Sequence, residues 1–450
     1  MSEVAPVTAH RLGARLAAAQ ASGRLPSVVA GVLRDGAPAW LGAYGAEPVP
    51  GHDPLDVQFR IGSITKTMTA VLVLQLVRDG RLDLDERASV VLGDVGYADS
   101  TIRSLLAHNS GMQAEPAGSW WERSAGLSFD ELAAANDGSG AVFPALRQFH
   151  YSNLAYGLLG EVVARLHDAS WWECVRTRIL DPLGMGRTSY LPEGAAAQGY
   201  SVHPYAGTLV DEPATDTGAM APAGQVWATI TDLATYNAFL LDGHADVLSR
   251  EWLLDASHPQ SGDRHDALGY AHGLGFQLIA GGSGMLVGHT GSMPGFLAGC
   301  FVDRARRTGA VVLTNATTGI APGDLVVTLL EELERSEPTI ATPWTPNQTV
   351  PVELADALGV WHWGNTPFVF TLEGGELVAR KDAVEKYRFA VVDGRVVGTA
   401  GHHAGEELHV VRRGDGSVSH LDIATFIYTR TPYDPDAPVP GGHPGRPVTG

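Results

Sequence analysis

The order of strand-like and helical segments in the first 336 residues limits the fold more than any other feature. Two strand-like runs within 27–47 meet at Asp35-Gly36, which is a hairpin signal. The apolar periodicity between 101 and 245 is mostly helical, strands return within 273–317, and a final helix ends near 336. This order predicts an α/β (α+β) domain. Both ends of the segment supply strands to an antiparallel sheet with helices packed on it, and a helical insertion lies beside the sheet.

The remaining residues predict a second, smaller domain. Residues 337–350 are rich in Pro and Thr without an apolar period, which is typical of a linker. Short alternating strands then follow within 351–433, separated by Gly-Gly, Asp-Gly and Gly-Asp-Gly turns, and this spacing predicts a small antiparallel β-barrel. The Pro- and Gly-rich tail at 434–450 is expected to be extended or disordered. We therefore expect a catalytic domain at 1–336, a linker, a barrel and a tail.

Composition excludes several classes of function. A net charge of -19 without a basic cluster argues against a nucleic-acid partner, and the absence of an apolar run of about 18 residues argues against a membrane span. Cys174 and Cys300 form no CxxC pattern and are expected to be buried as small hydrophobic residues, and the histidines form no HExxH motif. We expect no metal and no cofactor.

The N-terminal segment predicts a location. Residues 7–25 form an amphipathic helical pattern, and no basic stretch followed by an apolar stretch and a small-residue cleavage site precedes them. The expected location is the cytoplasm.

An unusual lysine marks the candidate site. The chain has three lysines against 28 arginines, and Lys66 lies in the apolar helical pattern of residues 59–77, three residues after Ser63. Residues i and i+3 share a helix face, so the Lys66 amine can reach the Ser63 hydroxyl. Ser63 begins the helix after Gly62, where free N–H groups stabilise negative charge, and burial of Lys66 would lower its pKa. The alternative interpretation is that Ser63 caps the helix and Lys66 reaches solvent from its surface.

Two further segments carry suitable side chains. Tyr151-Ser152-Asn153 stands at the mouth of a helical pattern and offers a phenol that can act as or relay to a base, and an amide that can bond Lys66 and a substrate carbonyl. His289-Thr290-Gly291 lies on a predicted strand, where the glycine lets a substrate backbone approach the strand edge. Each segment alone has a structural interpretation, with Tyr151 in the core and His289 at a strand end.

Together, SITK, YSN and HTG resemble the three signatures of the serine β-lactamase and penicillin-binding-protein superfamily, in the variants of class C β-lactamases, D-aminopeptidases and related esterases. The resemblance spans roughly residues 8–336. It implies that Ser63 is acylated, that Lys66 and Tyr151 share the proton transfers, and that Asn153 orients the substrate and Lys66. It also implies that His289 tunes Tyr151 or contacts the substrate. The oxyanion hole would be formed by the N–H groups of Ser63 and of Ser292, which follows Gly291. Whether Lys66 or Tyr151 is the acylation base stays open.

The added barrel narrows the resemblance. A catalytic domain followed by a lipocalin-like barrel is similar to the penicillin-binding-protein-type thioesterases, stand-alone cyclases of nonribosomal peptide assembly. This implies a peptidyl thioester on a carrier domain of a peptide synthetase as partner, and release by head-to-tail macrocyclisation. Arg430, near the end of the last predicted strand, would then grip a substrate carboxylate. An Arg430–Asp434 ion pair is the structural alternative.

The same residues also fit a D-amino-acid-specific peptidase or amidase, or an esterase, with water as acceptor. A binding protein without catalytic activity is disfavoured, because Ser63, Lys66 and Tyr151 are all competent residues. Specificity is expected to lie in loops 114–126 and 203–222, where Trp120 and Trp121 either form a pocket wall or are packed.

Overall fold

The computed structural model describes residues 3–263, 269–282, 284–341, 343–434 and 436–439. The chain divides into two compact units, Met1–Thr339 and Ile340–Gly450. No described helix has the length and apolar character that a membrane crossing requires. The predicted tail lies largely outside the described residues.

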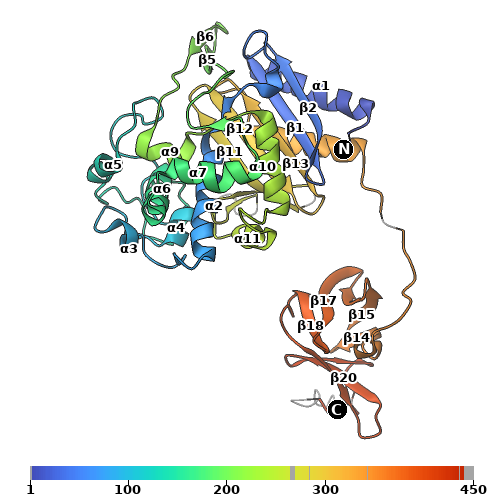
Figure 1. Ribbon diagram of the computed structural model, residues 1–450. Helices are drawn as coiled ribbons and strands as arrows, with labels where there is room; N and C mark the ends of the chain where they lie inside the picture. The colour runs from blue at the N-terminus through green and yellow to red at the C-terminus, as the bar shows by residue number, and fades with distance from the viewer. Residues whose placement is uncertain (1–2, 264–268, 283, 342, 435, 440–450) are drawn as a thin grey trace, which may run out of the picture. The chain divides into compact units, whose positions relative to one another are not determined.

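The first unit is built on an eight-stranded antiparallel sheet with the order β2-β1-β13-β12-β11-β10-β9-β8 (Figure 1). The N-terminal hairpin joins the later strands where β1 pairs with β13, for example Val28 opposite Thr314. The strands are β1 (Ser27–Arg34), β2 (Ala37–Gly45), β8 (Ser261–Gly262), β9 (Tyr270–His272), β10 (Gln277–Gly281), β11 (Gly284–Met293), β12 (Phe296–Asp303) and β13 (Thr308–Thr314). The predicted sheet, with strands from both ends of the segment, is confirmed.

Helices cover both faces of this sheet. On one face, α1 (Pro6–Gly23) and α12 (Pro322–Ser336) pack together, and their leucines share a core with β1 and β13. On the other face, α10 (Ile230–Asp242) packs against β1, β12 and β13. Because β1, β12 and β13 are covered on both faces, their sequences are continuous apolar runs.

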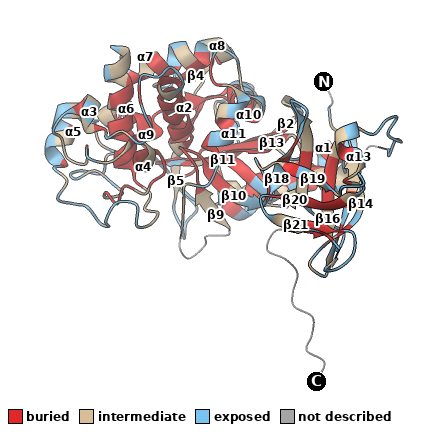
Figure 2. Ribbon diagram, turned by 90° about the horizontal axis from the view of Figure 1, so that it is seen from below, coloured by how far each residue is buried: buried red, intermediate tan, exposed pale blue. Residues whose placement is uncertain are grey.

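The predicted helical insertion forms a lobe beside the sheet. At its centre, α2 (Thr65–Arg78) contacts α6 (Asn153–His167) and α9 (Ala221–Gly224), and α2 is buried from Thr65 to Leu76 (Figure 2). A helix that is apolar on every side belongs in a core, which accounts for the pattern of residues 65–76. The other helices of the unit are α3 (Ser89–Leu92), α4 (Ile102–Leu106), α5 (Phe129–Ala135), α7 (Trp171–Val175), α8 (Asp181–Leu183) and α11 (Arg250–Ala256), with short 3-10 or π segments η1 (Pro54–Asp56), η2 (Gly62–Ile64), η3 (Arg176–Leu180) and η4 (Gly218–Met220).

Small strands position the segment before α2. In a three-stranded sheet, β3 (Phe59–Arg60) and β4 (Thr188–Ser189) both pair with β7 (Trp227–Ala228). A separate hairpin is formed by β5 (Tyr200–Val202) and β6 (Leu209–Asp211).

The two cysteines, Cys174 and Cys300, are free thiols and buried, as predicted.

The second unit is a nearly closed antiparallel barrel of eight strands, in the order β18-β17-β16-β15-β14-β21-β20-β19. The two end strands approach each other where Gly398 N donates to Glu406 O at 2.8 Å and Val397 bridges Glu407. After α13 (Val352–Ala355), the strands are β14 (Gly359–Trp363), β15 (Thr366–Glu373), β16 (Glu376–Lys381), β17 (Val384–Val392), β18 (Arg395–Gly401), β19 (Leu408–Arg412), β20 (Val418–Ile423) and β21 (Phe426–Thr429). The predicted small barrel is confirmed.

Candidate active site

Two glycines bring the start of the α2 segment against β11. Gly62 has φ +53, and a Cβ on it would lie 2.5 Å from the backbone N of Ser292. A Cβ on Gly291 would lie 1.9 Å from the carbonyl oxygen of Ile61 and 3.3 Å from the backbone N of Ser63. Only glycine fits at either position, because any side chain would push the two segments apart. The predicted oxyanion donors, the N–H groups of Ser63 and Ser292, are therefore held in neighbouring segments.

Ser63 and Lys66 form a close pair. Lys66 Nζ lies 2.9 Å from Ser63 Oγ and donates to Ala223 O at 2.6 Å. The Lys66 side chain is 0% exposed, so it does not reach solvent, and the helix caps at Ile61 and Ile64 use no side-chain bond, so Ser63 is not a cap. Both structural alternatives for this pair are wrong.

The setting of Lys66 favours a neutral amine. Burial lowers the pKa of Lys66 from 10.5 to about 7, while the negative charges of Glu115 and Glu122 act in the opposite direction. At neutral pH a large fraction of the Lys66 side chain is then unprotonated. A neutral amine next to a serine hydroxyl can accept the proton that the hydroxyl loses on attack.

Tyr151 is the second group that contacts Ser63. Its phenol hydrogen-bonds the Ser63 side chain, and its ring centroid lies 5.1 Å from Lys66 Nζ. Burial raises the pKa of the Tyr151 phenol well above its ordinary value. The phenol is therefore neutral in the free protein and can pass a proton between the serine oxygen and a leaving group.

His289 lies beside Tyr151 on β11. The two ring centroids are 6.1 Å apart, and His289 Nδ1 is hydrogen-bonded to Thr290 O. Burial, followed by the charge of Lys66, lowers the pKa of His289 to about 3, so the imidazole is neutral. It therefore brings no positive charge for a substrate carboxylate. That His289 tunes the Tyr151 proton or contacts the substrate stays a prediction.

Asn153, the first residue of α6, has a different partner from the one predicted. Its Nδ2 donates to Glu115 Oε1 at 2.7 Å, whereas Lys66 Nζ is engaged by Ser63 and Ala223. Asn153 is buried, with 9% of its surface exposed. Its predicted contact with a substrate carbonyl is untested.

The 114–126 loop adds residues that the sequence motifs did not identify. Trp121 Nε1 donates to Glu115 Oε2 at 2.7 Å, and the Trp121 ring lies 3.7 Å from the position of a Cβ on Gly224. Gly224 in turn borders Gly62. Trp121 therefore forms a wall near Ser63, whereas Trp120 is 57% exposed. No sequence pattern links Glu115 to Asn153, because the contact joins residues 38 positions apart.

Arg430 belongs to the second unit. Its guanidinium stacks on the Trp361 ring at 3.7 Å and donates to Val360 O at 3.2 Å and Asp356 O at 3.0 Å. Asp434 bonds Arg413 at 3.2 Å, so the alternative of an Arg430–Asp434 pair is wrong. The carboxylate-gripping role of Arg430 stays a prediction.

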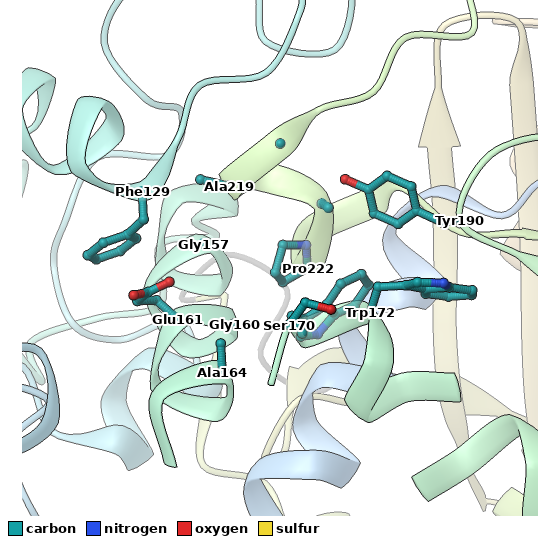
Figure 3. Close-up of a pocket in the computed structure, with 13 residues that line it drawn as sticks. Phe129, Gly157, Gly160, Glu161, Ala164, Ser170, Trp172, Tyr190, Ala219 and Pro222 are labelled. Atoms are coloured by element: carbon teal, nitrogen blue, oxygen red, sulfur yellow. The ribbon is translucent and has the colours of Figure 1, made fainter. Parts of the chain in front are cut away.

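A separate pocket of about 400 Å³ lies in the helical lobe, between α6 and the segments around it (Figure 3). Phe129, Trp172 and Tyr190 supply aromatic walls, and Pro222, next to the Lys66 partner Ala223, forms part of its lining. Among the described residues, no group of three or more His, Cys, Asp or Glu side chains could hold a metal ion.

Several solved structures share the fold of this chain. The octameric penicillin-binding protein homologue from Pyrococcus abyssi is similar with a TM-score of 0.65 at 20% identity, covering 93% of this chain and 99% of that one. SurE is similar with a TM-score of 0.60 at 25% identity, covering 94% and 99%. A D-stereospecific amidohydrolase from Streptomyces sp. is similar with a TM-score of 0.60 at 25% identity, covering 73% and 98%.

Sequence comparisons point the same way. Penicillin-binding protein 4 of Amycolatopsis lactamdurans is 29% identical over 68% of this chain and 84% of its own length. Beta-lactamase-like protein 2 of Dictyostelium discoideum is 27% identical over 53% of this chain, which spans only 46% of that protein. Residues 350–430 match a domain of unknown function, DUF7586, and residues 12–332 match the Beta-lactamase family. The chain therefore belongs to the beta-lactamase family and has its serine hydrolase fold.

Proposed function

We propose that this protein takes the acyl group of a nonribosomal peptidyl thioester onto Ser63 and releases it by head-to-tail macrocyclisation. The observation that best supports an acyl-enzyme on Ser63 is the 2.9 Å contact between Ser63 Oγ and the buried Lys66 Nζ, whose pKa is lowered to about 7. The contact gives the serine a neutral base at physiological pH.

The first half-reaction transfers the acyl group. Ser63 Oγ attacks the thioester carbonyl, and its proton passes to the neutral Lys66 amine, either directly or through the Tyr151 phenol, which gives its own proton to Lys66 as it takes the one from Ser63. The N–H groups of Ser63 and Ser292 bind the oxyanion, and loss of one such donor typically costs about 10² to 10³ in rate. The C–S bond then breaks, and the thiolate takes the proton and leaves as a thiol.

The second half-reaction forms the ring. The free N-terminal amine of the same peptide attacks the Ser63 ester and gives up a proton to the base. The C–Oγ bond breaks, and Ser63 Oγ recovers the proton. The products are a cyclic peptide and the free enzyme.

The domain order supports the cyclase over a simple hydrolase. The catalytic unit is followed by a barrel, and this order resembles the penicillin-binding-protein-type thioesterases. SurE and the penicillin-binding protein homologue align over 94% and 93% of this chain and therefore over both units, whereas the D-stereospecific amidohydrolase covers 73%. A carrier domain of a peptide synthetase as partner, and a cytoplasmic location, belong to this proposal.

A second function, D-amino-acid amidase or peptidase activity, is favoured by Glu115. Its carboxylate is fixed beside the site by Asn153 Nδ2 and Trp121 Nε1, both at 2.7 Å, and its charge acts on Lys66. A carboxylate at this place suits the free α-ammonium group of a D-aminoacyl substrate. The similarity to the D-stereospecific amidohydrolase supports the same substrate class. Water would then replace the amine as acceptor.

Product analysis separates the two functions. The substrate is a peptidyl thioester with a free N-terminus and a D-residue at the thioester end, and the matched control is the N-acetylated peptide. The cyclase proposal expects cyclic peptide from the first substrate only. Linear acid alone from both would refute the cyclase and leave the hydrolase. Absence of turnover of this thioester, of small esters and of D-aminoacyl amides would refute both.

A further inference from the structure

His108 has a backbone conformation that a buried side chain rarely adopts. It follows α4, is 0% exposed and has φ +54, in the left-handed region. A non-glycine residue stays in this region only where surrounding contacts hold it there. His108 also contacts His272 and Tyr156, and two hydrogen bonds and a ring stack join it to one catalytic segment.

The main chain and the side chain of His108 bracket Tyr151. His150 N donates to His108 O at 2.7 Å, and Ser152 N donates to His108 Nδ1 at 3.0 Å. Between these two bonds the imidazole stacks on the Tyr151 ring, with centroids 4.2 Å apart and planes 25° apart. Three consecutive residues are thus held by one histidine.

The bond from Ser152 also sets the protonation state of the ring. Because Nδ1 accepts an N–H, the neutral imidazole carries its proton on Nε2. Burial and then the nearby groups His272, Lys66, His289 and His150 lower the pKa of His108 well below its ordinary value. The Tyr156 ring, 5.2 Å away on α6, adds no charge. The clamp is therefore intact throughout the neutral pH range.

We infer that His108 is a positioning residue for acylation: it fixes the backbone on both sides of Tyr151 and the plane of the phenol, so that the phenolic oxygen stays against Ser63. In this role His108 acts through Tyr151 and takes no proton in the reaction. The inference rests on the proposed acyl-enzyme and holds for either acceptor, amine or water.

Two substitutions at this position separate its contributions. Asn tolerates the left-handed region, and its Oδ1 can accept the Ser152 N–H in place of Nδ1, but it has no ring to stack on Tyr151. Gly relieves the backbone strain and removes both the acceptor and the ring. His167→Asn is the matched control, because His167 also lies in the helical lobe with an unpartnered Nε2 but at the far end of α6.

The experiment measures the burst rate of Ser63 acylation by the p-nitrophenyl ester of an N-acetyl-D-amino acid, with folding checked by circular dichroism and thermal denaturation. Since a misplacement of about 1 Å can cost about 10²-fold, His108→Gly should lose about 10²-fold in acylation rate with KM changed less than about threefold. His108→Asn should recover to within about tenfold of wild type and stay at least about threefold below it, and the control should stay within about twofold.

Several results would overturn the inference. They are wild-type acylation by folded His108→Gly, equal losses in the Gly and Asn variants, or losses that follow thermal stability alone. If His108→Gly does not fold, the Asn variant decides by itself, and an acylation rate equal to wild type refutes the assignment. A wild-type protein that forms no acyl-enzyme would instead refute the proposed function.

Discussion

Replacing Lys66 with Met should stabilise the protein at neutral pH while abolishing acylation. Lys66 is 0% exposed, and its pKa is lowered from 10.5 to about 7 by burial. The unfolded chain therefore binds a proton at Lys66 between about pH 7 and 10.5 that the folded protein has released. Because the pKa of Lys66 is lower in the folded than in the unfolded protein, Lys66 reduces the free energy of unfolding. This reduction is complete below about pH 7 and disappears as the pH rises towards 10.5.

The size of this reduction in the free energy of unfolding follows from the pKa shift of Lys66. A change from 10.5 to about 7 is about 3.5 units, or about 5 kcal/mol at about 1.4 kcal/mol per unit. About 4 kcal/mol of this penalty acts at pH 7 and about 1 kcal/mol at pH 10, so the difference is about 3 kcal/mol. Met fills a similar volume without a charge, so the variant escapes the penalty.

The assay compares the free energy of unfolding of Lys66→Met and wild type at pH 7 and pH 10 by urea denaturation. The stability advantage of the Met variant should be about 3 kcal/mol larger at pH 7 than at pH 10. Lys386→Met, at an exposed position of the barrel, is the control for the loss of a lysine outside the site. A Lys66→Met advantage that is the same at both pH values would refute a buried amine with a lowered pKa.

Three further predictions concern Gly291, Glu115 and Arg430. Gly291→Ala should lower the acylation rate, measured with the activated ester, by a factor of at least about 10². The added Cβ would lie 1.9 Å from Ile61 O and would push the two oxyanion donors apart, so a wild-type rate would contradict that packing. Glu115→Gln should reduce, by about tenfold, the preference for a D-aminoacyl amide with a free ammonium group over its N-acetyl form, measured as a ratio of kcat/KM, and an unchanged ratio would remove Glu115 from substrate binding. Arg430→Ala should slow turnover of the peptidyl thioester and leave turnover of the small activated ester unchanged. The control variant Arg412→Ala, which removes an exposed partner of Asp356, should leave turnover of both substrates unchanged. If Arg430→Ala slows both reactions equally, Arg430 has a structural role.

The sequence predicted those parts of the fold and site that depend on local geometry. Hairpin signals and apolar runs led to the sheet and the barrel, because each strand pair is built from its own periodicity and turn. The Ser63–Lys66 pair was predicted because residues i and i+3 meet on any helical turn, even though α2 begins at Thr65 and Ser63 lies in a 3-10 turn.

Contacts between distant segments were beyond the reach of these patterns. The Glu115–Asn153 bond and the His108 clamp on Tyr151 form only when α6 is packed against the loops after α4. Arg430 shows the same limit, because its hydrogen-bond partners are backbone carbonyls of residues about 70 positions earlier, which no side-chain pattern reveals. An ion pair with Asp434 was the structural alternative for Arg430, and in the fold Asp434 bonds Arg413 instead.

Intact-mass measurement after millisecond exposure to a peptidyl thioester with a D-residue at the thioester end tests the central claim most directly. We expect a wild-type adduct of the mass of the peptidyl group, located by proteolysis on the fragment that contains Ser63, and no adduct on Ser63→Ala. A thioester consumed at the same rate by Ser63→Ala, or an adduct located on another residue, would contradict it.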